Sequence, residues 1–292
     1  MRLNLFYMIF CGLCLFSLPF HAQAQFGILG GFNQISPEQE RNLGRQLARE
    51  IEEQKPIIHN PRVQAYIDDL GKRVLVGVGR PQFIYRFRVV DELDVNAFAI
   101  FAGHVYVNRG LILMAQSEGQ LASVMAHEIG HIQARHPAKR LAAMQNVNLL
   151  GGLASLLLGS MTGQGTGRLL QSGLKLFGTA GILHYSREQE EEADALGVHY
   201  LYQAGFDPRD TVRMFRLLEE IQGQRQSPIG EFFSSHPSPR TRMEKVEGII
   251  ATLPKQPAFA ERPEKFSAIQ ERLSRGILRG GYRGRRYLDI LK

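Results

Sequence analysis

Cysteine is nearly absent from this sequence of 292 residues and occurs only at Cys11 and Cys14. Both cysteines lie in an apolar leader, residues 1–24, which begins with a positive charge and ends in the small-residue cleavage signal Ala-Gln-Ala. We expect this leader to be a signal peptide, so that the exported chain would have no disulfide. A retained membrane anchor is the alternative, because the apolar run approaches the length of a membrane span. Export without cysteine fits the bacterial periplasm, where a free thiol is a liability.

An excess of charge of one sign is also lacking in most of the chain. The formal net charge is +7, but +5 of it comes from residues 271–292 and one more positive charge comes from Arg2. The rest of the chain is almost neutral, and an exported protein is not expected to bind nucleic acid. The basic tail would instead suit an anionic lipid, the outer membrane or an acidic partner surface.

Long uninterrupted apolar runs are missing after the leader, and so is any 34-residue repeat. Residues 147–183 are apolar and poor in charge, but glycines interrupt them too often for a membrane span. We expect one or two mobile helices there, able to act as a lid or to touch membrane or unfolded polypeptide; a buried helical hairpin is the alternative. The chain is expected to form one domain, residues 25–255, followed by a linker and basic tail, residues 256–292.

What the sequence does contain is the segment LASVMAHEIGHIQARH. Ser117 with Gln120 before it forms a capping-box pattern, and an apolar stripe at helical spacing follows, so a helix is predicted. On that helix His127 and His131 share one face with Glu128 beside them, which is the H-E-x-x-H arrangement of zinc hydrolases. A catalytic zinc needs three protein ligands and one open position, so another part of the chain has to supply the third ligand.

Candidates for the third ligand lie on a second predicted helix, which a capping box at Ser186 opens and Gly205 ends. Glu190 and Asp194 are four residues apart and share a face. Glu190 could bind zinc while Asp194 accepts the free N–H of a liganding imidazole. From the residues alone Glu190 is only slightly better placed than Glu191. The remaining glutamates of this helix are expected to be solvated charges on its surface; they are Glu188, Glu191 and Glu192.

The remaining pattern predicts an α+β fold that is mostly helical, with a small antiparallel sheet next to the histidine helix. Helices are expected after Ser36, Asn60, Asp207 and Ser238, each of which precedes a proline. Strands are expected at residues 83–90, 96–100 and 104–108. An edge strand beside a zinc site could hold a peptide by main-chain hydrogen bonds, or the strands could only cover the core. His104 could face the same cleft.

His236 stands in the unusual segment SSHPSPRTR, just before a predicted helix. A proline follows it directly, which is uncommon for a histidine of the core. Arg242 lies within two turns and could stabilise the oxyanion that forms when water attacks a carbonyl, or it could form a surface ion pair.

Several separated segments, spanning roughly residues 35–251, are together similar to one family. They are NAFA at 96–99, NRGLI at 108–112, HEIGHIQARH from His127, SREQEEEAD from Ser186 and HPSPRTR from His236. With these segments in this order the chain resembles the gluzincin-type zinc metallopeptidases. That family includes HtpX, the CAAX prenyl proteases and, as its soluble periplasmic branch, BepA and LoiP.

The resemblance implies a zincin (gluzincin) metalloprotease fold and a role for each candidate residue. One Zn²⁺ per chain would be bound by His127, His131 and Glu190, and Asp194 would accept the free N–H of a liganding imidazole. Glu128 would be the general base. In periplasmic members the histidine matching His236 can occupy the fourth zinc position as a latch, and the arginine matching Arg242 assists catalysis.

Two departures from the family pattern bear on these expectations. Members commonly have Pro-Gly-Gly where this chain has Phe101-Ala102-Gly103. BepA-like proteins continue into tetratricopeptide repeats, and we expect none here, because some forty residues without a 34-residue repeat follow the similar region. We expect a periplasmic zinc endopeptidase that degrades misfolded or misassembled envelope proteins. The alternatives are a chaperone-like protein that binds unfolded outer-membrane polypeptides around a structural zinc, and an envelope-anchoring protein that acts through its arginine-rich tail.

Overall fold

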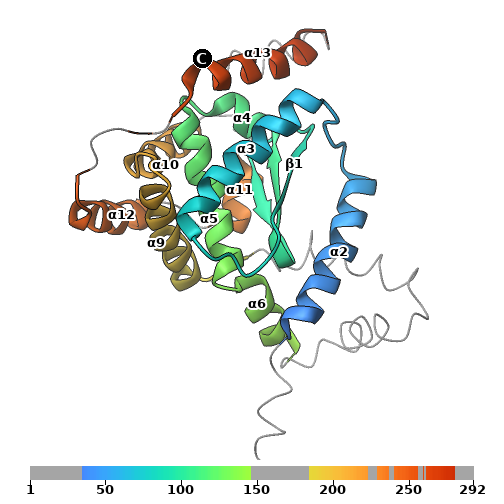
Figure 1. Ribbon diagram of the computed structural model, residues 1–292, viewed down its shortest axis with the longest axis vertical. Coiled ribbons are helices and arrows are strands. Elements are labelled where there is room, and N and C mark those ends of the chain that lie inside the picture. The colour runs from blue at the N-terminus through green and yellow to red at the C-terminus, as the bar shows by residue number, and fades with distance from the viewer. Residues whose placement is uncertain are drawn as a thin grey trace, which may run out of the picture. The chain divides into compact units, whose positions relative to one another are not determined.

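The computed structural model describes residues 35–145, 184–222, 229–236, 240–255, 259 and 261–279 (Figure 1). The predictions for the leader, for residues 147–183 and for the end of the tail lie outside these residues. The described part is α+β and mostly helical, as predicted. No helix in it combines the length and the apolar character that a membrane crossing requires.

The elements follow one another in an order that places strands between helices. They are α2 (Pro37–Gln54), α3 (Pro61–Val78), β1 (Arg86–Val90), β2 (Ala97–Ala99), the 3-10 turn η1 (Phe101–Gly103), β3 (His104–Asn108), α4 (Arg109–Met114), α5 (Glu118–Gln133), α6 (His136–Gln145), α9 (Arg187–Gln203), α10 (Arg209–Gln222), α11 (Gly230–Ser235), α12 (Arg240–Thr252) and α13 (Pro263–Arg279).

Several helices begin where the sequence supplies a capping residue. Ser36 and Ser186 each form a complete capping box at the start of α2 and α9. At α5 only half of the predicted box forms: Ser117 accepts the N–H of Gln120 at 3.0 Å. The Gln120 side chain bonds instead to the N–H of Gln116, at 2.8 Å. The histidine helix therefore starts where predicted, with a different second bond.

The sheet corrects one prediction, because it is mixed and not antiparallel. Its strand order is β1-β3-β2, with β1 parallel to β3 and β2 antiparallel to β3. A tight turn joins β2 to β3 and makes that pair antiparallel. The chain leaving β1 passes to the far side of β3 before β2 begins, so β1 runs in the same direction as β3. Alternation of apolar residues identifies strands but does not determine which strands pair.

The turn between β2 and β3 contains the departure from the family pattern. Ala102 has φ 57° and Gly103 has φ 93°, both in the left-handed region. That conformation costs a non-glycine residue about 1–2 kcal/mol, which explains why glycine is common there in the family that the chain resembles. The turn keeps a backbone path suited to glycine although alanine occupies its middle position.

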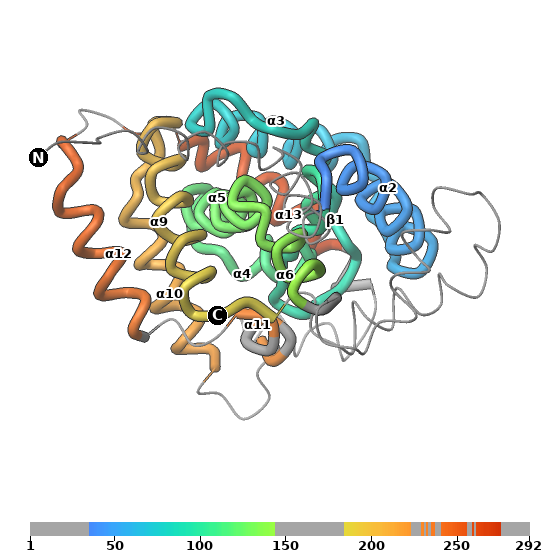
Figure 2. The backbone as a smooth tube through the Cα atoms, turned by 90° about the horizontal axis from the view of Figure 1, so that it is seen from below, coloured from blue at the N-terminus to red at the C-terminus, as the bar shows by residue number. Residues whose placement is uncertain are grey.

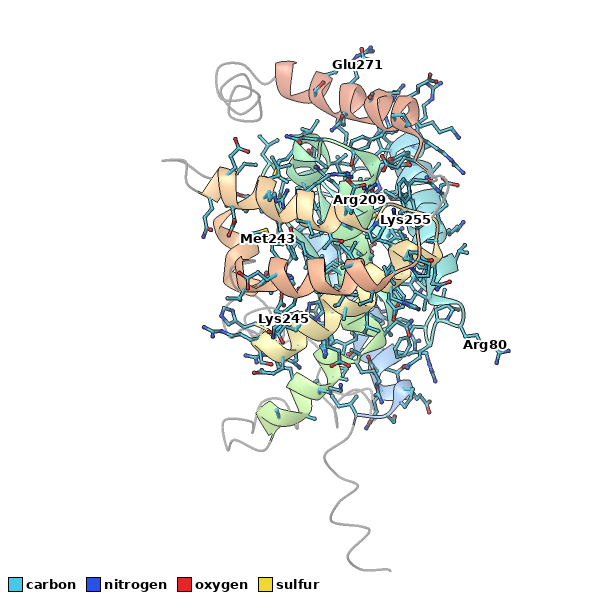
Figure 3. All side chains as sticks on the ribbon, turned by 90° about the vertical axis from the view of Figure 1, so that its left-hand side faces the viewer. Arg80, Arg209, Met243, Lys245, Lys255 and Glu271 are labelled. Atoms are coloured by element: carbon cyan, nitrogen blue, oxygen red, sulfur yellow. The ribbon has the colours of Figure 1, made fainter. Side chains whose placement is uncertain are left out.

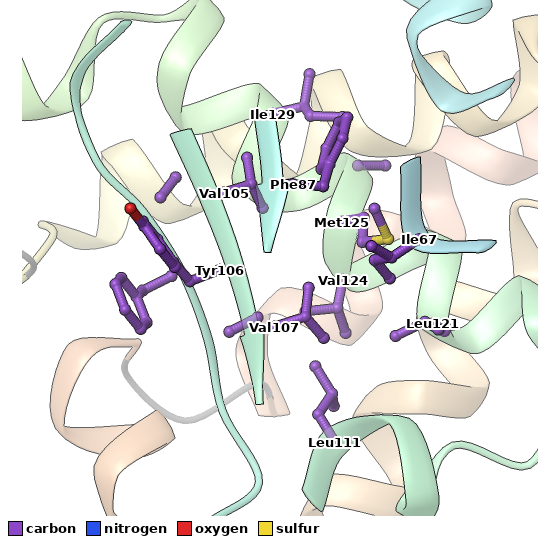
Figure 4. Packing of buried hydrophobic residues seen from close by; sticks show 14 of the residues in the cluster. Ile67, Phe87, Val105, Tyr106, Val107, Leu111, Leu121, Val124, Met125 and Ile129 are labelled. Carbon is purple, nitrogen blue, oxygen red and sulfur yellow. The ribbon is translucent and has the colours of Figure 1, made fainter. Parts of the chain in front are cut away.

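One face of α5 packs on the sheet. Figure 4 shows Leu121, Val124, Met125 and Ile129 of α5 with Phe87, Val105 and Val107 of the sheet, Ile67 of α3 and Leu111 of α4. Each of these side chains is at most 5% exposed. Full burial of one such side chain contributes roughly 1.5–3 kcal/mol, so this layer fixes α5 against the strands.

The other sides of α5 are covered by helices. α9 and α10 both pack against α5, and α12 packs against α9 and α10. Figure 2 shows α5 near the centre of the described chain, with α9, α10 and α12 on one side of it. Figure 3 looks onto α12, where Met243 and Lys245 are labelled. Every residue of α5 from Glu118 to Ile132 is buried, so its polar groups have to be satisfied within the protein.

Residues 263–279, expected as linker and tail with a short helix at 267–278, form the longer helix α13. This helix packs against α3 and α4 and buries Phe266, Ile269 and Leu273. The side chain of Gln270 donates to two carbonyl groups at the end of α4, at 2.9 and 2.8 Å. This part of the expected tail therefore belongs to the folded body.

A buried carboxylate joins α13 to the start of α5. Glu118 accepts hydrogen bonds from the Tyr66 hydroxyl, from Arg73 and from the N–H of Arg262, at 3.0, 3.0 and 2.7 Å. A second carboxyl group, Glu261, faces Asp210 of α10, whose Oδ2 is buried and has no other hydrogen bond in the described chain. Two carboxyl groups that face each other in this way are stable together when they share a proton.

The surroundings of this pair hold further charged groups. Arg213 bonds to Asp207 and Asp210, and Arg209 also bonds to Asp207. Burial, with smaller contributions from Asp210, Glu118 and Asp207, raises the pKa of Glu261 from 4.5 to about 7. The folded chain thus holds the proton of Glu261 more strongly than the unfolded chain does.

We expect the folded chain to lose stability as the pH rises through this range. The pKa of Glu261 is higher in the folded than in the unfolded state, so its contribution is complete below pH 4.5 and is lost as the pH passes about 7. Between about pH 5.5 and pH 8 the thermal midpoint should fall further in the wild type than in Glu261→Gln. Glu271→Gln, an exposed change on α13, serves as control and should match the wild type. Equal pH dependence in wild type and Glu261→Gln would contradict the shared proton.

Candidate metal centre

The helices α5 and α9 approach closely because each has a glycine at their contact. A Cβ atom on Gly130 would lie 2.8 Å from the carbonyl oxygen of Ala193. A Cβ atom on Gly197 would lie 3.1 Å from the main-chain nitrogen of His127. Such distances leave no room for a side chain at Gly130 and little at Gly197. The close contact brings the side chains of the histidine helix within reach of those on α9.

Four predicted ligands meet in the space between these helices and α11. His127, His131, Glu190 and His236 each offer one ligand atom, and these atoms all lie within 4.8 Å of one another. The two Nε2 atoms of His127 and His131 are 3.0 Å apart, and the Glu190 carboxylate oxygens lie 3.6 and 3.3 Å from them. Two ligands of a tetrahedral zinc ion are separated by roughly 3.3 Å. The spacing therefore suits one ion bound by this group.

Asp194 and Arg242 hold two of these groups from behind. Asp194 Oδ1 lies 2.9 Å from Nδ1 of His127, which leaves Nε2 of that imidazole facing the other ligands. Arg242 donates to both oxygens of Asp194, at 2.6 and 2.7 Å, and its Nη1 lies 2.5 Å from Glu190. Burial alone would raise the pKa of Asp194, but the charge and hydrogen bonds of Arg242 outweigh it and lower that pKa. The arginine thus lies on the carboxylates of Asp194 and the ligand Glu190 and not at the protein surface.

Glu128 is buried next to this group with no strong partner. Both of its carboxylate oxygens are buried and neither has a hydrogen bond of ordinary geometry with the described residues. Burial raises the pKa of its carboxyl, which the charges of His236 and His127 oppose. A carboxylate with free oxygen atoms in a buried site is suited to exchanging a proton with a bound water molecule.

His236 lies between the other ligands and Glu128. Its Nδ1 is 2.9 Å from Glu190 Oε1 and 3.4 Å from His127 Nε2, while its Nε2 is 3.4 Å from Glu128 Oε1. The side chain is almost completely buried. Burial lowers the pKa of His236, but the charges of Glu190 and Glu128 outweigh this effect and raise it. A positive charge is therefore favoured at this point.

The residues present fit a divalent metal ion. Glu128, Glu190 and Asp194 place three carboxyl groups in the interior, where Arg242 is the cation that contacts two of them. Buried negative charge without an equal positive charge is costly, and a divalent cation would supply it. Imidazole nitrogen and carboxylate oxygen are ligands that zinc accepts readily. Burial also lowers the pKa of His131 well below its usual value, which favours the neutral form that binds metal.

Three residues at the centre were not identified by sequence reasoning. The ring of Tyr185 stacks on His131 with 3.8 Å between ring centroids. His136, fully buried, lies 2.8 Å from His131, and it contacts Glu192, which is exposed as expected but also takes part in this contact. The only signal in the sequence was that His136 is a third histidine within ten residues.

Two other expectations have clear structural outcomes. Glu191, the near alternative to Glu190, forms an ion pair with Lys245 of α12 at 2.5 Å and is not among the four grouped ligands. His104 does not face the centre: it lies on the side of β3 that carries Tyr106, which contacts α2. Burial, together with nearby arginines, lowers the pKa of His104 to about 4.

Two histidines and one glutamate on packed helices, with a further carboxylate beside them, define the centre of a metallopeptidase of the gluzincin class. Residues 61–250 match the model of the family described as Peptidase family M48. The chain belongs to this family, and the resemblance to HtpX- and BepA-like metallopeptidases is confirmed.

Named relatives agree with this assignment. The chain is 30% identical over 213 residues to the beta-barrel assembly-enhancing protease of Escherichia coli (strain K12), covering 72% of this chain and 43% of that protein. It is 29% identical over 239 residues to the protein of the same name in Yersinia pestis, covering 81% and 49%. It is 30% identical over 221 residues to the mitochondrial metalloendopeptidase OMA1 of Schizosaccharomyces pombe, covering 74% and 62%.

The chain thus spans less than half the length of the two bacterial proteins that it resembles. The family and the relatives named as protease and metalloendopeptidase support the predicted metalloendopeptidase.

Substitution of the contact glycine should disturb the centre from a distance. Gly130→Ala would force its Cβ atom against the Ala193 backbone and separate α5 from α9. We expect a net loss of about 1–3 kcal/mol in the free energy of unfolding. We also expect weaker zinc binding, measured by competition with a chelator, since the ligands on the two helices move apart.

Gly248→Ala provides the matched control on α12, because a Cβ atom there would meet nothing within 4 Å. That change should leave zinc binding unaltered and stabilise the helix by up to about 1 kcal/mol. Unaltered zinc binding and stability in Gly130→Ala would show that the helix contact does not position the ligands.

Proposed function

We propose that this protein is a zinc-dependent endopeptidase with a histidine latch on its metal centre. The observation that carries the proposal is the burial of Glu128 next to four grouped ligands: neither of its carboxylate oxygens has a hydrogen bond of ordinary geometry with the described residues. A structural metal site has no use for a fifth polar group of this kind, whereas hydrolysis requires a group that transfers protons. Family membership supports zinc as the metal, since M48 metallopeptidases are zinc-dependent.

The chain's own residues would divide the work of hydrolysis. Zinc bound by His127, His131 and Glu190 would supply Lewis acidity, which makes water a better nucleophile and a carbonyl a better electrophile. Glu128 would accept the proton from the attacking water and return it to the leaving amine. Arg242 would keep Glu190 charged and in position.

The edge of the sheet offers a place for the peptide. Main-chain hydrogen bonds to β3 flank β2 at both ends: the carbonyl of Asn96 accepts from the N–H of Asn108, and the N–H of Ile100 donates to the carbonyl of His104, each at 2.9 Å. Because such bonds alternate along an antiparallel pair, the main-chain groups of Ala97 and Ala99 face away from β3. The Ala99 N–H lowers the pKa of Glu128, which puts this edge beside the proposed base. An extended peptide could add to this edge with its scissile bond near Glu128. Both alanines are buried in this arrangement, so the site would have to open first.

His236 is the group that would keep the site closed. It contacts the ligands through Nδ1 and approaches Glu128 through Nε2, so it fills the space between metal ligands and base. Water and a substrate carbonyl would need this same space. We infer that activity is low until His236 leaves.

The proposed substrates are unfolded or misassembled envelope polypeptides, and the proposed location is the periplasm, at or near the outer membrane. Support comes from the leader-like first 24 residues and from bacterial relatives named for assembly of β-barrel proteins. Contact with anionic lipid through the basic tail is part of the same proposal.

Replacement of the proposed base tests the reaction. Glu128→Gln keeps the shape of the side chain but removes its ability to accept a proton, so casein cleavage by zinc-loaded protein should fall at least about 100-fold. Zinc content, measured by inductively coupled plasma mass spectrometry, should stay at one per chain. Glu191→Gln is the control on α9 and should cleave as the wild type does. Cleavage by Glu128→Gln at the wild-type rate would remove Glu128 from the mechanism.

One observation favours a second candidate, a chaperone-like protein with a structural zinc: four ligands grouped in a buried site match a closed structural site. The same variant separates the two functions. Suppression of outer-membrane protein aggregation by wild type and Glu128→Gln alike, without cleavage by either wild type or His236→Ala, would favour the chaperone.

Removal of the latch should activate the enzyme. In His236→Ala the three ligands on α5 and α9 remain and the space next to Glu128 opens, so we expect casein cleavage to rise several-fold. His199→Ala, an exposed histidine on α9, is the control and should not change the rate. Unchanged or reduced cleavage in His236→Ala, with zinc still bound, would argue against the latch.

A further inference from the structure

A second buried histidine lies behind the ligand His131. The two Nδ1 atoms of His131 and His136 are 2.8 Å apart, and Nε2 of His136 lies 3.0 Å from Glu192 Oε2. His131 and His136 are both fully buried, whereas the Glu192 side chain is about half exposed. The three side chains form a continuous hydrogen-bonded chain from the candidate metal ligand to the surface of α9.

The direction of the hydrogen bonds in this chain is determined by its two ends. Nε2 of His131 faces Glu190 and His127, so it is the atom available to a metal, and Nδ1 therefore carries the proton. Nδ1 of His136 must then accept that proton's hydrogen bond. His136 carries its own proton on Nε2 and donates it to the carboxylate of Glu192.

We propose that His136 is a positioning residue that, together with Glu192, fixes the tautomer and orientation of the ligand His131. The inference rests on the proposed metal site and deepens it. Metal-bound histidines usually donate their second N–H to a carboxylate or a carbonyl oxygen, and such partners strengthen metal binding. Behind His127 the carboxylate of Asp194 lies 2.9 Å from Nδ1, whereas His131 has an imidazole with a carboxylate behind it.

The backbone around His136 is arranged to make this contact. α5 ends at Gln133, and Arg135 adopts φ 56°, which turns the chain so that α6 begins at His136. The guanidinium of Arg135 is held by the buried carboxylate of Glu40, at 2.9 Å, and by the Ile35 carbonyl oxygen. A left-handed conformation at an arginine costs about 1–2 kcal/mol, so this turn persists because the contacts around it compensate.

Two substitutions that place the same amide group at different distances from the backbone test the proposal. In asparagine the amide oxygen is as many bonds from Cβ as Nδ1 is in histidine, whereas in glutamine the amide group takes the place of Nε2. His136→Asn can therefore accept the His131 N–H, and His136→Gln cannot do so in the same position. Zinc affinity of the full chain, measured by chelator competition, should change less than about 3-fold in His136→Asn and fall roughly 10- to 100-fold in His136→Gln.

A variant at the surface keeps the test decisive if the buried substitutions unfold the protein. Glu192→Ala removes the last of the three hydrogen-bonded side chains, His131, His136 and Glu192, and should weaken zinc binding several-fold. Glu191→Ala on the same helix should not. Nitrogen-15 NMR of the zinc-loaded wild type supplies a second measurement and should show His136 with its proton on Nε2. Equal affinity in His136→Asn and His136→Gln, no effect of Glu192→Ala, or a proton on Nδ1 of His136 would each overturn the proposal.

Failure of this inference is distinguishable from failure of the proposed function. If wild-type protein binds no stoichiometric zinc, the metal site and the role of His136 fall together. If it binds zinc and the paired variants do not differ, only the role of His136 is wrong. If it binds zinc, the variants differ and nothing is cleaved, the peptidase proposal fails while the positioning role stands.

Discussion

The contact between α5 and α9 is the constraint on which the centre depends. α5 is buried along almost its whole length, and α9 packs against it and against α3 and α12, so neither helix can move far without disturbing the core. The glycines at their contact bring the two backbones close enough for side chains of one helical turn to reach across. Imidazoles from α5 then meet carboxylates from α9 in a buried space. That geometry would be costly without balancing charge, which is why the charge balance governs the remaining features of the site.

Arg242 shows how that balance is met. The sequence permitted an oxyanion-stabilising role or a surface ion pair, but its guanidinium is buried on Asp194 and Glu190. A single planar guanidinium has five N–H donors and can serve two carboxylates at once, which a lysine could not do with the same geometry. Arg242 thus orients Asp194, whose Oδ1 lies 2.9 Å from Nδ1 of His127. The two histidine ligands differ in what stands behind them, a buried ion pair for one and a hydrogen-bonded chain to the surface for the other.

The sequence predicted those features that depend on local patterns. Ser36, Asn60 and Ser186 identified helix starts, and the four-residue spacings identified His127 with His131 and Glu190 with Asp194. No local pattern distinguishes Glu190 from Glu191. They differ only in what they face in the folded chain: Glu190 faces the histidines, and Glu191 faces Lys245. For the same reason the parallel pairing of β1 and the role of His136 could not be read from the sequence. Both result from segments that meet only in the folded chain, such as the left-handed turn at Arg135.

The closed arrangement of four ligands has to be reconciled with hydrolysis. In a purely structural site the ligands alone would be retained, and apolar side chains would fill the space around them at lower cost than a carboxyl group. Glu128 contradicts that expectation, because it is fully buried and has no hydrogen bond of ordinary geometry in the described chain. A group kept in so unfavourable a state is more simply explained by a function in proton transfer. His236 approaches both this carboxyl and the ligands from a separate helix, α11, so its departure would free the base and one ligand position in the same movement.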